Sequence, residues 1–423
     1  MNYLDMFDDI VEIMHNDYSG CIDKKGWDNP YEYRKKIDAL MNENRISDEN
    51  FRNLILDYIS DFRDGHILFN FIDGEKTIRY NCGFKCRRYE DKLYITEVKK
   101  EDRVRQGMAI VELDGRPIPE LSDRFSSHLM YDSKERQLWD KIMLKFTNCT
   151  LEDENKDRFF IDLRKYKEDE YIPEYSLKAL DKNISILKLS DFANVDNINS
   201  LIEGNKKILN TCRYLIIDVR SNGGGNDSSY YRLLNYMNSY KISLEKLQNM
   251  PPMEINYTEN NCNISIKAYT DMINEIDDDN TKAILEYTIN QLENHKGEGF
   301  VEFEDEGFED IVVGGEIMPE KIVVLSDVYC GSSGDAFVDV AKNCDKVTVM
   351  GRGTKGITDY SNLIPKIYSD KFILLYPTSR SRRIDIGEGI AENGVTPDIY
   401  IPWTPEHIFK DIDMEKAIEF LVK

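Results

Sequence analysis

Residues 329–337 have the sequence Tyr-Cys-Gly-Ser-Ser-Gly-Asp-Ala-Phe, the most informative stretch of the chain. It follows the apolar run 322–325, which predicts a buried strand, and it precedes the helical pattern 336–342. A serine at a turn from strand to helix exposes its hydroxyl beside backbone N–H groups. A nucleophile with an oxyanion hole needs this setting, although small residues at such a turn more often form only the turn.

A second stretch, residues 214–226, has the sequence Tyr-Leu-Ile-Ile-Asp-Val-Arg-Ser-Asn-Gly-Gly-Gly-Asn. An apolar strand here opens into three consecutive glycines, which allow a tight turn and bring N–H groups close to a ligand. A phosphate-binding loop and a plain strand exit are the alternatives. A Walker-type loop is excluded because no Lys-Ser/Thr pair follows the glycines, and a dinucleotide fingerprint is excluded because the glycines are consecutive.

Four motifs follow one another along the chain: Asp-Val-Arg-Ser-Asn-Gly-Gly-Gly at 218–225, Val-Leu-Ser-Asp-Val-Tyr-Cys-Gly-Ser-Ser-Gly-Asp at 324–335, Val-Met-Gly-Arg-Gly-Thr-Lys-Gly at 349–356 and Glu-Asn-Gly-Val-Thr-Pro-Asp at 392–398. Together they resemble the peptidase family of the C-terminal processing proteases and the tricorn core, over about residues 60 to 400. The resemblance implies an α/β serine peptidase with a crotonase-like core of stacked ββα units and a PDZ-like module before it.

The resemblance also implies roles for individual residues. Ser332 matches the family's nucleophile, and its neighbour Ser333 is the alternative if the alignment is off by one place. The backbone N–H groups of Ser333 and Gly224 would form the oxyanion hole. Gly225 and Asp335 would contact the substrate, although Asp335 also fits an acid at a helix N-terminus, where the macrodipole favours it.

The catalytic base separates two branches of the family. In the processing proteases a lysine activates the serine, and counting from Ser332 places that lysine's position on Ile357. Lys355 lies two places earlier, which on a strand keeps the same face but moves the side chain by about 7 Å. Lys355 therefore fits a strand-edge or substrate-contact residue better than a base.

The tricorn-like branch instead uses a histidine far upstream and a glutamate near the end of the chain. The segment 61–66, Asp-Phe-Arg-Asp-Gly-His, resembles its histidine segment, and Glu392 lies in the matching last motif. The resemblance thus implies His66 as general base and Glu392 as the group that orients it. Glu388, four residues before Glu392, is the rival for the second role.

Composition limits the partners and the compartment. A formal net charge of −23 disfavours binding to nucleic acid or to an anionic membrane. The N-terminal residues lack a signal-peptide pattern, and no stretch has eighteen consecutive apolar residues, so we expect a cytoplasmic protein without a membrane span. The eight cysteines form no CxxC pair, and the spacing 82–86 has no matching His/Cys pair, so we expect reduced thiols and neither metal nor cofactor.

The patterns divide the chain into three parts. Helical spacing over 1–70 predicts a small helical bundle, and short β patterns over 76–170 predict the PDZ-like module, with a β-sandwich-like spacer as the alternative. A PDZ module takes a peptide as an added strand and captures its terminal carboxylate. Residues 172–423 are the expected catalytic core, with an insertion at about 230–315 that borders the substrate cleft.

The sequence therefore predicts a serine peptidase that hydrolyses peptides or exposed chain ends. The presence of Ser332, His66 and Glu392 favours this enzyme over a catalytically silent, PDZ-containing peptide-binding protein. A Ser/Lys processing protease and an esterase acting on a non-peptide ester remain as alternatives. No oligomeric state is predicted.

Overall fold

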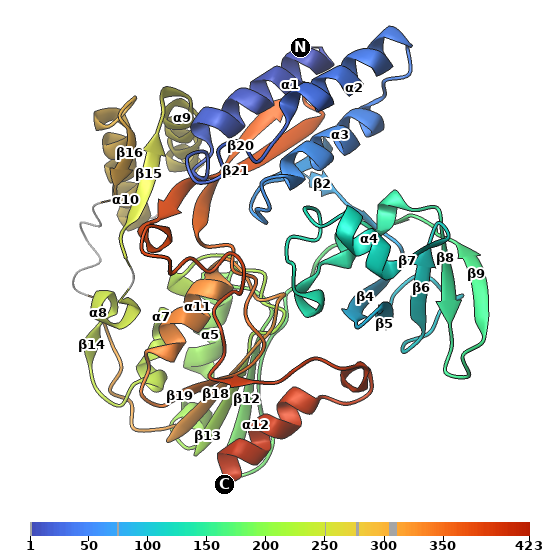
Figure 1. Ribbon diagram of the computed structural model, residues 1–423. Coiled ribbons are helices and arrows are strands. Elements are labelled where there is room, and N and C mark those ends of the chain that lie inside the picture. The colour runs from blue at the N-terminus through green and yellow to red at the C-terminus, as the bar shows by residue number, and fades with distance from the viewer. Residues whose placement is uncertain (1, 74–75, 250, 276–278, 304–310) are drawn as a thin grey trace.

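The computed structural model describes residues 2–73, 76–249, 251–275, 279–303 and 311–423 (Figure 1). These residues form three six-stranded sheets, and each sheet has its own cluster of buried apolar side chains. We refer to them as the central sheet, the upper sheet and the β module. Two pairs of short strands complete the β-structure of the described residues.

The central sheet has the order β11-β12-β13-β18-β19-β22. Its strands from β12 onward are parallel, and β11 is an antiparallel edge strand. Parallel sheets are covered on both faces, which explains why these strands are almost uniformly apolar. The strands are β11 (Tyr175–Ala179), β12 (Ile184–Leu189), β13 (Tyr214–Asp218), β18 (Lys321–Ser326), β19 (Val347–Gly351) and β22 (Ile399–Tyr400).

Helices cover both faces of the central sheet. Leu215 and Ile217 of β13 point to one face of the sheet, where they pack in a cluster with residues of the helices that cover it. Ile216, between them, points to the other face and packs in a cluster with the last helix. Side chains thus alternate across the strand as its two-residue period requires. The first face carries α5 (Val195–Gly204), α7 (Ser228–Met237) and α11 (Ser333–Lys342), with the short α6 (Lys206–Leu209) after α5, and the other face carries α12 (Ile412–Val422).

The upper sheet joins segments that lie far apart in the sequence. Strand β21 pairs with β20 along nearly its whole length, with β1 over residues 372–375 and with β15 over 379–381. Its strands are β1 (Leu68–Asp73), β2 (Lys76–Ile78), β15 (Met253–Tyr257), β16 (Gly299–Glu302), β20 (Tyr360–Tyr368) and β21 (Phe372–Ser381).

The N-terminal helices α1 (Tyr3–Glu12), α2 (Pro30–Asn42) and α3 (Asp48–Ser60), with the π-helix Ile13–Asp17, cover this upper sheet. Phe51 of α3 packs against Phe372 of β21 with ring centroids 5.6 Å apart. The helices predicted for 1–70 are present, but they do not form a self-contained bundle. They share one apolar core with β1, β20 and β21, against which each helix packs its apolar face.

The β module contains β4 (Phe84–Tyr89), β5 (Lys92–Val98), β6 (Ala109–Leu113), β7 (Arg116–Pro117), β8 (Asn148–Glu152), β9 (Arg158–Asp162) and α4 (Ile118–Arg124). An Asp-Gly pair forms the turn between β6 and β7, where Asp114 and Gly115 have φ of 47° and 69°. Positive φ at both positions is what a tight hairpin turn requires. Shorter elements nearby are β3 (Tyr80–Asn81), β10 (Tyr166–Lys167) and the 3₁₀ helices Lys134–Arg136, Trp139–Lys141 and Met143–Lys145.

The predicted insertion at 230–315 is not a separate unit. Its first helix, α7, packs in the central core, and its strands β15 and β16 belong to the upper sheet. The segment therefore connects two layers of the molecule. Its remaining elements are β14 (Ile242–Ser243), α8 (Leu244–Gln248), α9 (Glu259–Glu275), α10 (Asp279–Asn294) and β17 (Val312–Val313), and the 3₁₀ helices Arg382–Ile384 and Pro405–Ile408 follow later in the chain.

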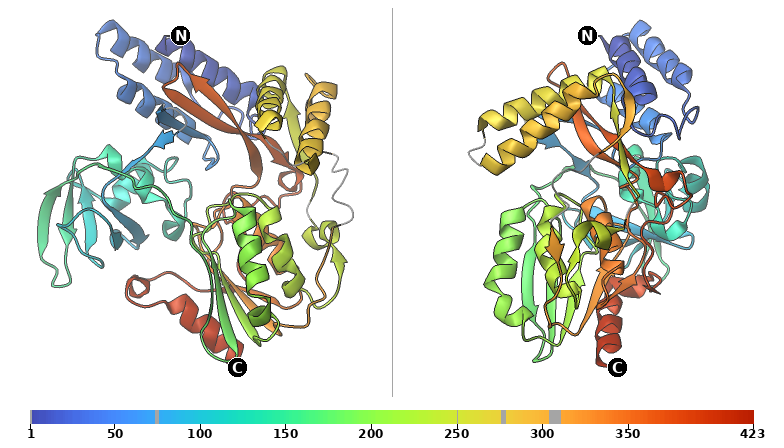
Figure 2. Two further views of the ribbon diagram at one scale, coloured as in Figure 1. Left: turned by 180° about the vertical axis from the view of Figure 1, so that it is seen from behind. Right: turned by 90° about the vertical axis from the view of Figure 1, so that its left-hand side faces the viewer.

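The two termini lie at opposite ends of the molecule in every view (Figure 2). Among the described residues, none of the helices combines the length and the apolar character that crossing a membrane requires. All eight cysteines are free thiols. Over the described ranges, no group of three or more His, Cys, Asp or Glu side chains is placed to hold a metal ion.

Candidate active site

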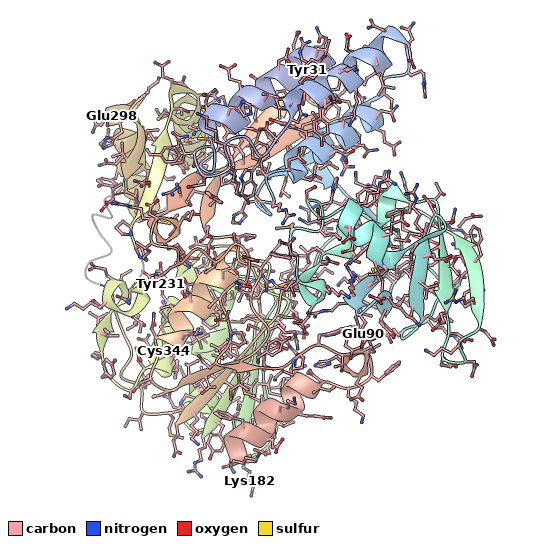
Figure 3. All side chains as sticks on the ribbon, viewed as in Figure 1. Tyr31, Glu90, Lys182, Tyr231, Glu298 and Cys344 are labelled. Atoms are coloured by element: carbon pink, nitrogen blue, oxygen red, sulfur yellow. The ribbon has the colours of Figure 1, made fainter. Side chains whose placement is uncertain are left out.

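A cleft of about 1100 Å³ opens where the carboxyl edge of the central sheet faces the upper sheet. Neighbouring strands β13 and β18 end here, and ligands of open α/β sheets bind at such an edge. Tyr231 of α7, labelled in Figure 3, lines the cleft. The other lining residues are His66, Gly225, Asn226, Asp227, Leu244, Glu245, Gln248, Pro251, Met253, Ile255, Glu302, Phe303, Ser332, Ser333, Ala336, Thr358, Ser361, Asn362, Leu363, Ser379, Ser381 and Arg383.

Ser332 lies on this cleft at the turn between β18 and α11. Its backbone has φ of 59° and ψ of −126°, a conformation that costs a non-glycine residue about 1–3 kcal/mol. Hydrogen bonds hold the turn in this form. The Ser332 N–H donates to the Asp335 carboxylate at 2.8 Å, and the Gly331 N–H donates to the Asn222 carbonyl at 2.9 Å. The side chain is half-buried, so its hydroxyl can meet a ligand.

Ser333, the alternative nucleophile, is placed differently. Its side chain is buried, and its hydroxyl donates to the carbonyl of Gly225 at 2.9 Å. Its N–H is the first of α11, where no intrahelical acceptor exists, and no other described residue accepts it. Ser333 thus offers a backbone donor beside Ser332, while its hydroxyl is engaged in fixing the glycine run.

The glycine run lies directly against the nucleophile turn. A Cβ built on Gly224, which has φ of +97°, would come within 2.5 Å of the Ser332 Cβ. A side chain there would displace the nucleophile. However, the Gly224 N–H donates to the Asn222 side-chain oxygen at 2.9 Å, so the predicted oxyanion-hole donor is occupied. The N–H of Gly225, which lines the cleft, has no acceptor among the described residues.

Asp335 does not contact the cleft, contrary to its predicted part in substrate binding. It is fully buried, and besides the Ser332 N–H its carboxylate accepts the N–H groups of Gly356 at 2.7 Å and Ile357 at 3.0 Å. Burial raises the pKa of Asp335, while the hydrogen bonds from Thr354 and these amides oppose that rise. Asp335 therefore ties the nucleophile turn to the segment 354–357.

His66 enters the same cleft from the segment between α3 and β1. Its Nδ1 lies 2.5 Å from the carbonyl oxygen of Tyr360, and its backbone N–H donates to Asp64 at 2.8 Å. A carbonyl oxygen can only accept, so Nδ1 carries a proton, and in the neutral ring the lone pair is then on Nε2. The ring is thus oriented as a base requires, by a backbone carbonyl.

Glu392 and Glu388 do not have the predicted position beside His66. Both are exposed on the segment between β21 and β22, and neither lines the cleft. Over the described residues, no hydrogen bond or ion pair connects either carboxylate with the His66 ring. Ser332, Ser333, Gly225 and His66 line one cleft, and these glutamates do not.

Sequence reasoning missed Tyr360 and Asp359. Tyr360 supplies the carbonyl that orients His66, and the buried Asp359 accepts the N–H groups of Ile390 and Ala391 at 2.7 and 2.9 Å. Burial, opposed by Arg383, raises the pKa of Asp359 to about 6. Asp359 and Tyr360 lie shortly after the third motif, which ends at residue 356, and this proximity was the sequence signal that could have identified them.

Lys355 lies behind Ser332 and His66. Its stem passes between Gly331 and Gly65, the residues that precede Ser332 and His66, and a Cβ on either glycine would meet it within 2.8 to 3.5 Å. Lys355 does not line the cleft. Burial lowers its pKa, and attraction to Asp335 and Asp64 opposes that change.

The β module contacts the same segment. Arg136 donates to the carbonyls of Gly353 at 3.0 Å and Thr354 at 2.7 Å, and the Tyr131 hydroxyl donates to the Lys355 carbonyl. Arg87 of β4 forms two hydrogen bonds, at 2.6 and 2.9 Å, with Asp327 after β18. These contacts fix the module against the carboxyl edge of the central sheet.

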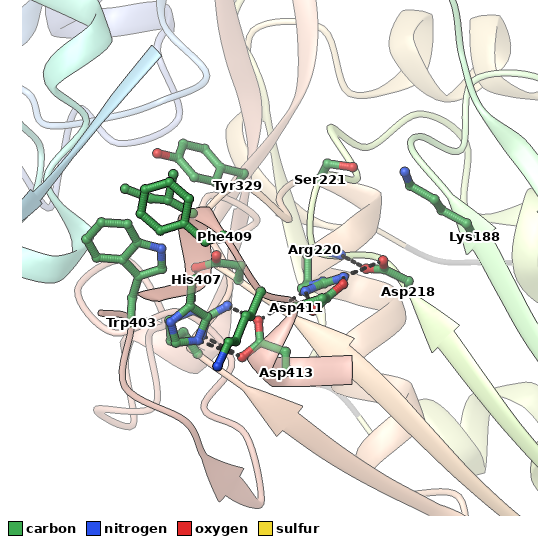
Figure 4. Close-up of a pocket in the computed structure, with 14 residues that line it drawn as sticks. Lys188, Asp218, Arg220, Ser221, Tyr329, Trp403, His407, Phe409, Asp411 and Asp413 are labelled. Atoms are coloured by element: carbon green, nitrogen blue, oxygen red, sulfur yellow. Dashed lines mark hydrogen bonds and ion pairs between the residues drawn. The ribbon is translucent and has the colours of Figure 1, made fainter. Parts of the chain in front are cut away.

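A second hollow, of about 490 Å³, lies beside the C-terminal segment (Figure 4). Most of its charged groups are paired within the protein. Arg220 bonds to Asp218 and Asp411, and the buried Arg352 bonds to Asp413. This network holds the residues before α12 on the sheet edge, and a structural role accounts for it.

Comparisons with known proteins identify the family and the fold of this chain. Residues 183–401 match the model of peptidase family S41. The structure resembles that of mature CPAF, with a TM-score of 0.66 at 12% identity over 99% of this chain and 96% of that one. Mature CPAF complexed with lactacystin gives 0.64 at 13% identity over 100% and 97%. Such identities establish a shared fold only, and no curated protein sequence matches. Because the family model covers more than half of its residues, the chain belongs to peptidase family S41 and is a serine-type peptidase.

Proposed function

We propose that this cleft hydrolyses peptides or exposed chain ends by acylation of Ser332, with His66 as the general base. The observation that carries the proposal is that one cleft is lined both by a strained, half-buried serine and by a histidine whose Nδ1 is already engaged by a backbone carbonyl. His66 Nε2 would take the proton as the Ser332 oxygen attacks the peptide carbonyl. The same imidazolium would then protonate the leaving amine, and water would release the acyl group by the reverse steps.

The negative charge that develops on the carbonyl oxygen needs backbone donors. We assign one to the Ser333 N–H, which has no internal acceptor among the described residues. The second comes from the glycine run, where the Gly225 N–H is free and the Gly224 N–H is held by Asn222. Gly224 then has a steric role, since only glycine allows the approach to Ser332.

A Ser/Lys mechanism is the second candidate. It is favoured by the lowered pKa of Lys355 and by the passage of its stem beside Gly331. Against it, Lys355 is absent from the cleft lining whereas His66 is part of it. We therefore assign Lys355 to packing behind the site.

The proposal also includes a PDZ-like unit and a crotonase-like core. The β module has the hairpin and covering helix of a PDZ-like unit, and the central sheet with α5, α7 and α11 is the counterpart of a crotonase-like core. A PDZ-like unit would position peptide C-termini for the cleft. Comparison of kcat/KM for free-carboxylate and amidated forms of one peptide tests this, and equal values would remove carboxylate capture.

Fluorophosphonate labelling tests the catalytic assignment most directly. The reagent should modify one serine, and mass spectrometry should locate the adduct on Ser332. Peptide hydrolysis should be lost in step with labelling. An adduct on Ser333, or full activity in the labelled protein, would contradict the proposal.

A further inference from the structure

Asp64 and Tyr360 accept the two hydrogen bonds that fix His66, and one buried lysine, Lys24, contacts both of these residues. Lys24 lies between the N-terminal π-helix and α2 and is 5% exposed. Its Nζ is 3.6 Å from the Asp64 carboxylate and 4.3 Å from the centre of the Tyr360 ring. Asp64 accepts the backbone N–H of His66, and the Tyr360 carbonyl accepts its ring N–H.

A tyrosine completes the chain from the lysine to the base. Lys24 Nζ donates to the Tyr18 hydroxyl at 2.8 Å, and that hydroxyl donates to Asp64 at 2.7 Å. Tyr18 is fully buried, and its ring lies 5.7 Å from that of Tyr360. Ammonium, hydroxyl, carboxylate and amide therefore form one continuous path to His66.

A buried ammonium is costly, so its placement needs compensation. Burial lowers the pKa of Lys24, and attraction to Asp64, Asp359 and Asp23 opposes that change. Asp23 is itself paired with Arg380 of β21 at 2.7 Å. The acids that face Lys24 thus come from its own segment, from the α3–β1 connection and from the start of β20.

We propose that Lys24 is a positioning residue for His66, which it holds through Asp64 and Tyr360 from the N-terminal layer. The inference rests on the proposed function, because it assumes that His66 is the base. The distant N-terminal segment then does more than cover the upper sheet. It sets the position and the electrostatic surroundings of the catalytic imidazole.

The test compares Lys24→Met with Lys25→Met, its exposed neighbour. Lys24→Met should lower kcat by about 10- to 100-fold and change KM by less than about threefold, because a misplaced base slows chemistry rather than binding. The acid limb of the kcat/KM profile should move to higher pH by about half a unit or more, since loss of a cation beside Asp64 favours the imidazolium. Lys25→Met should match wild type.

Tyr368→Phe controls for stability. It removes a hydrogen bond to Asp9 in the same layer without touching His66, so it should lower Tm and leave kcat and the pH profile unchanged. Tyr18→Phe keeps the ring but breaks the path, and it should lower kcat several-fold without moving the acid limb. Lys24→Arg should recover part of the lost kcat because it restores a cationic donor.

Two outcomes would overturn the inference. Lys24→Met with a lowered Tm but wild-type kcat and pH profile would reduce Lys24 to a structural role. If that variant does not fold, wild-type kcat in Tyr18→Phe would have the same consequence. Activity that survives His66→Ala would instead contradict the proposed function itself, so the two failures are distinguishable.

Discussion

The two halves of the proposed catalytic pair, Ser332 and His66, are built in contrasting ways. Ser332 sits on a turn whose contacts come from its own βα unit and from two neighbouring loops at the edge of the same sheet, 222–225 and 354–357. His66 is fixed by Tyr360, 294 positions later in the chain, and by a network that begins at Lys24. The nucleophile is thus a local feature of the central sheet, and the base depends on long-range assembly of the upper layer.

This difference has a consequence for stability and function. A change in the central sheet has to disturb its closely packed core before Ser332 moves. A change in the N-terminal helices can displace His66 while the nucleophile turn stays intact. Activity should therefore be lost before the fold when the upper layer is perturbed. The predictions below test the two halves separately.

The largest effect is expected from Ser332→Ala. Removal of the nucleophile of a coupled catalytic unit costs on the order of 10⁴- to 10⁶-fold in kcat. The fold should be retained, because alanine keeps the backbone donors of the turn. The control is Ser333→Ala, which loses the hydroxyl's hydrogen bonds with the Gly225 carbonyl and Asp227 and should keep most of the turnover. An inactive Ser333 variant beside an active Ser332 variant would reverse the assignment.

His66→Ala should have the next largest effect. A general base contributes about 10²- to 10⁴-fold to the rate, and turnover should fall by that amount. Lys355→Met keeps the stem that packs between Gly331 and Gly65, and it should cost less than about tenfold. Steady-state kinetics on one peptide substrate measures both. If Lys355→Met is inactive and His66→Ala is near wild type, the Ser/Lys mechanism holds and the contrast between the two halves disappears.

The nucleophile turn was predictable because its signal is local. Strand, small residues and helix follow one another within 322–342, and the structure places β18, the turn and α11 there. The same holds for the glycine run and for the Asp-Gly turn of the β module. In each case backbone geometry is fixed by residues close together in the sequence.

The environment of the base was not predictable in the same way. Strand β1 pairs with β21 across about 300 positions, and no sequence pattern specifies such a partner. The occupation of the Gly224 N–H by Asn222 and the exposure of Glu392 are likewise properties of the assembled loops. The motif singled out His66, whose part as the base stays a prediction, but it did not indicate the residues that hold it.

The stability of the protein should depend on pH through Asp359, which lies next to Tyr360 on the His66 side of the site. The pKa of Asp359 is raised to about 6, so between about pH 4 and 6 the folded protein holds a proton that the unfolded chain releases. Its contribution to stability therefore falls as pH rises through this range, by roughly 2–3 kcal/mol in total. Asp359→Asn removes this dependence and keeps an acceptor for the amides of Ile390 and Ala391.

Thermal unfolding of wild type and Asp359→Asn from pH 4 to 7 gives the measurement. The stability of wild type relative to the variant should decline with rising pH. If stability changes with pH in the same way in both proteins, Asp359 is ionised throughout this range in the folded protein, contrary to the prediction. Because Asp359 adjoins Tyr360, the kcat of the variant should also change, by less than about tenfold.

The smallest effect is expected from Glu392→Ala, the residue that the family resemblance implied as the orienter of His66. A carboxylate bonded to a catalytic imidazole stabilises the imidazolium, and its loss costs several orders of magnitude in kcat when the contact exists. Here the Tyr360 carbonyl occupies that position, and Glu392 is exposed outside the cleft. We therefore expect a change in kcat of less than about threefold, equal to that of Glu388→Ala, its exposed neighbour. A loss of 100-fold or more in Glu392→Ala alone would show that the 388–394 segment moves toward His66 during catalysis, and the base would then depend on a carboxylate as well as on the upper layer.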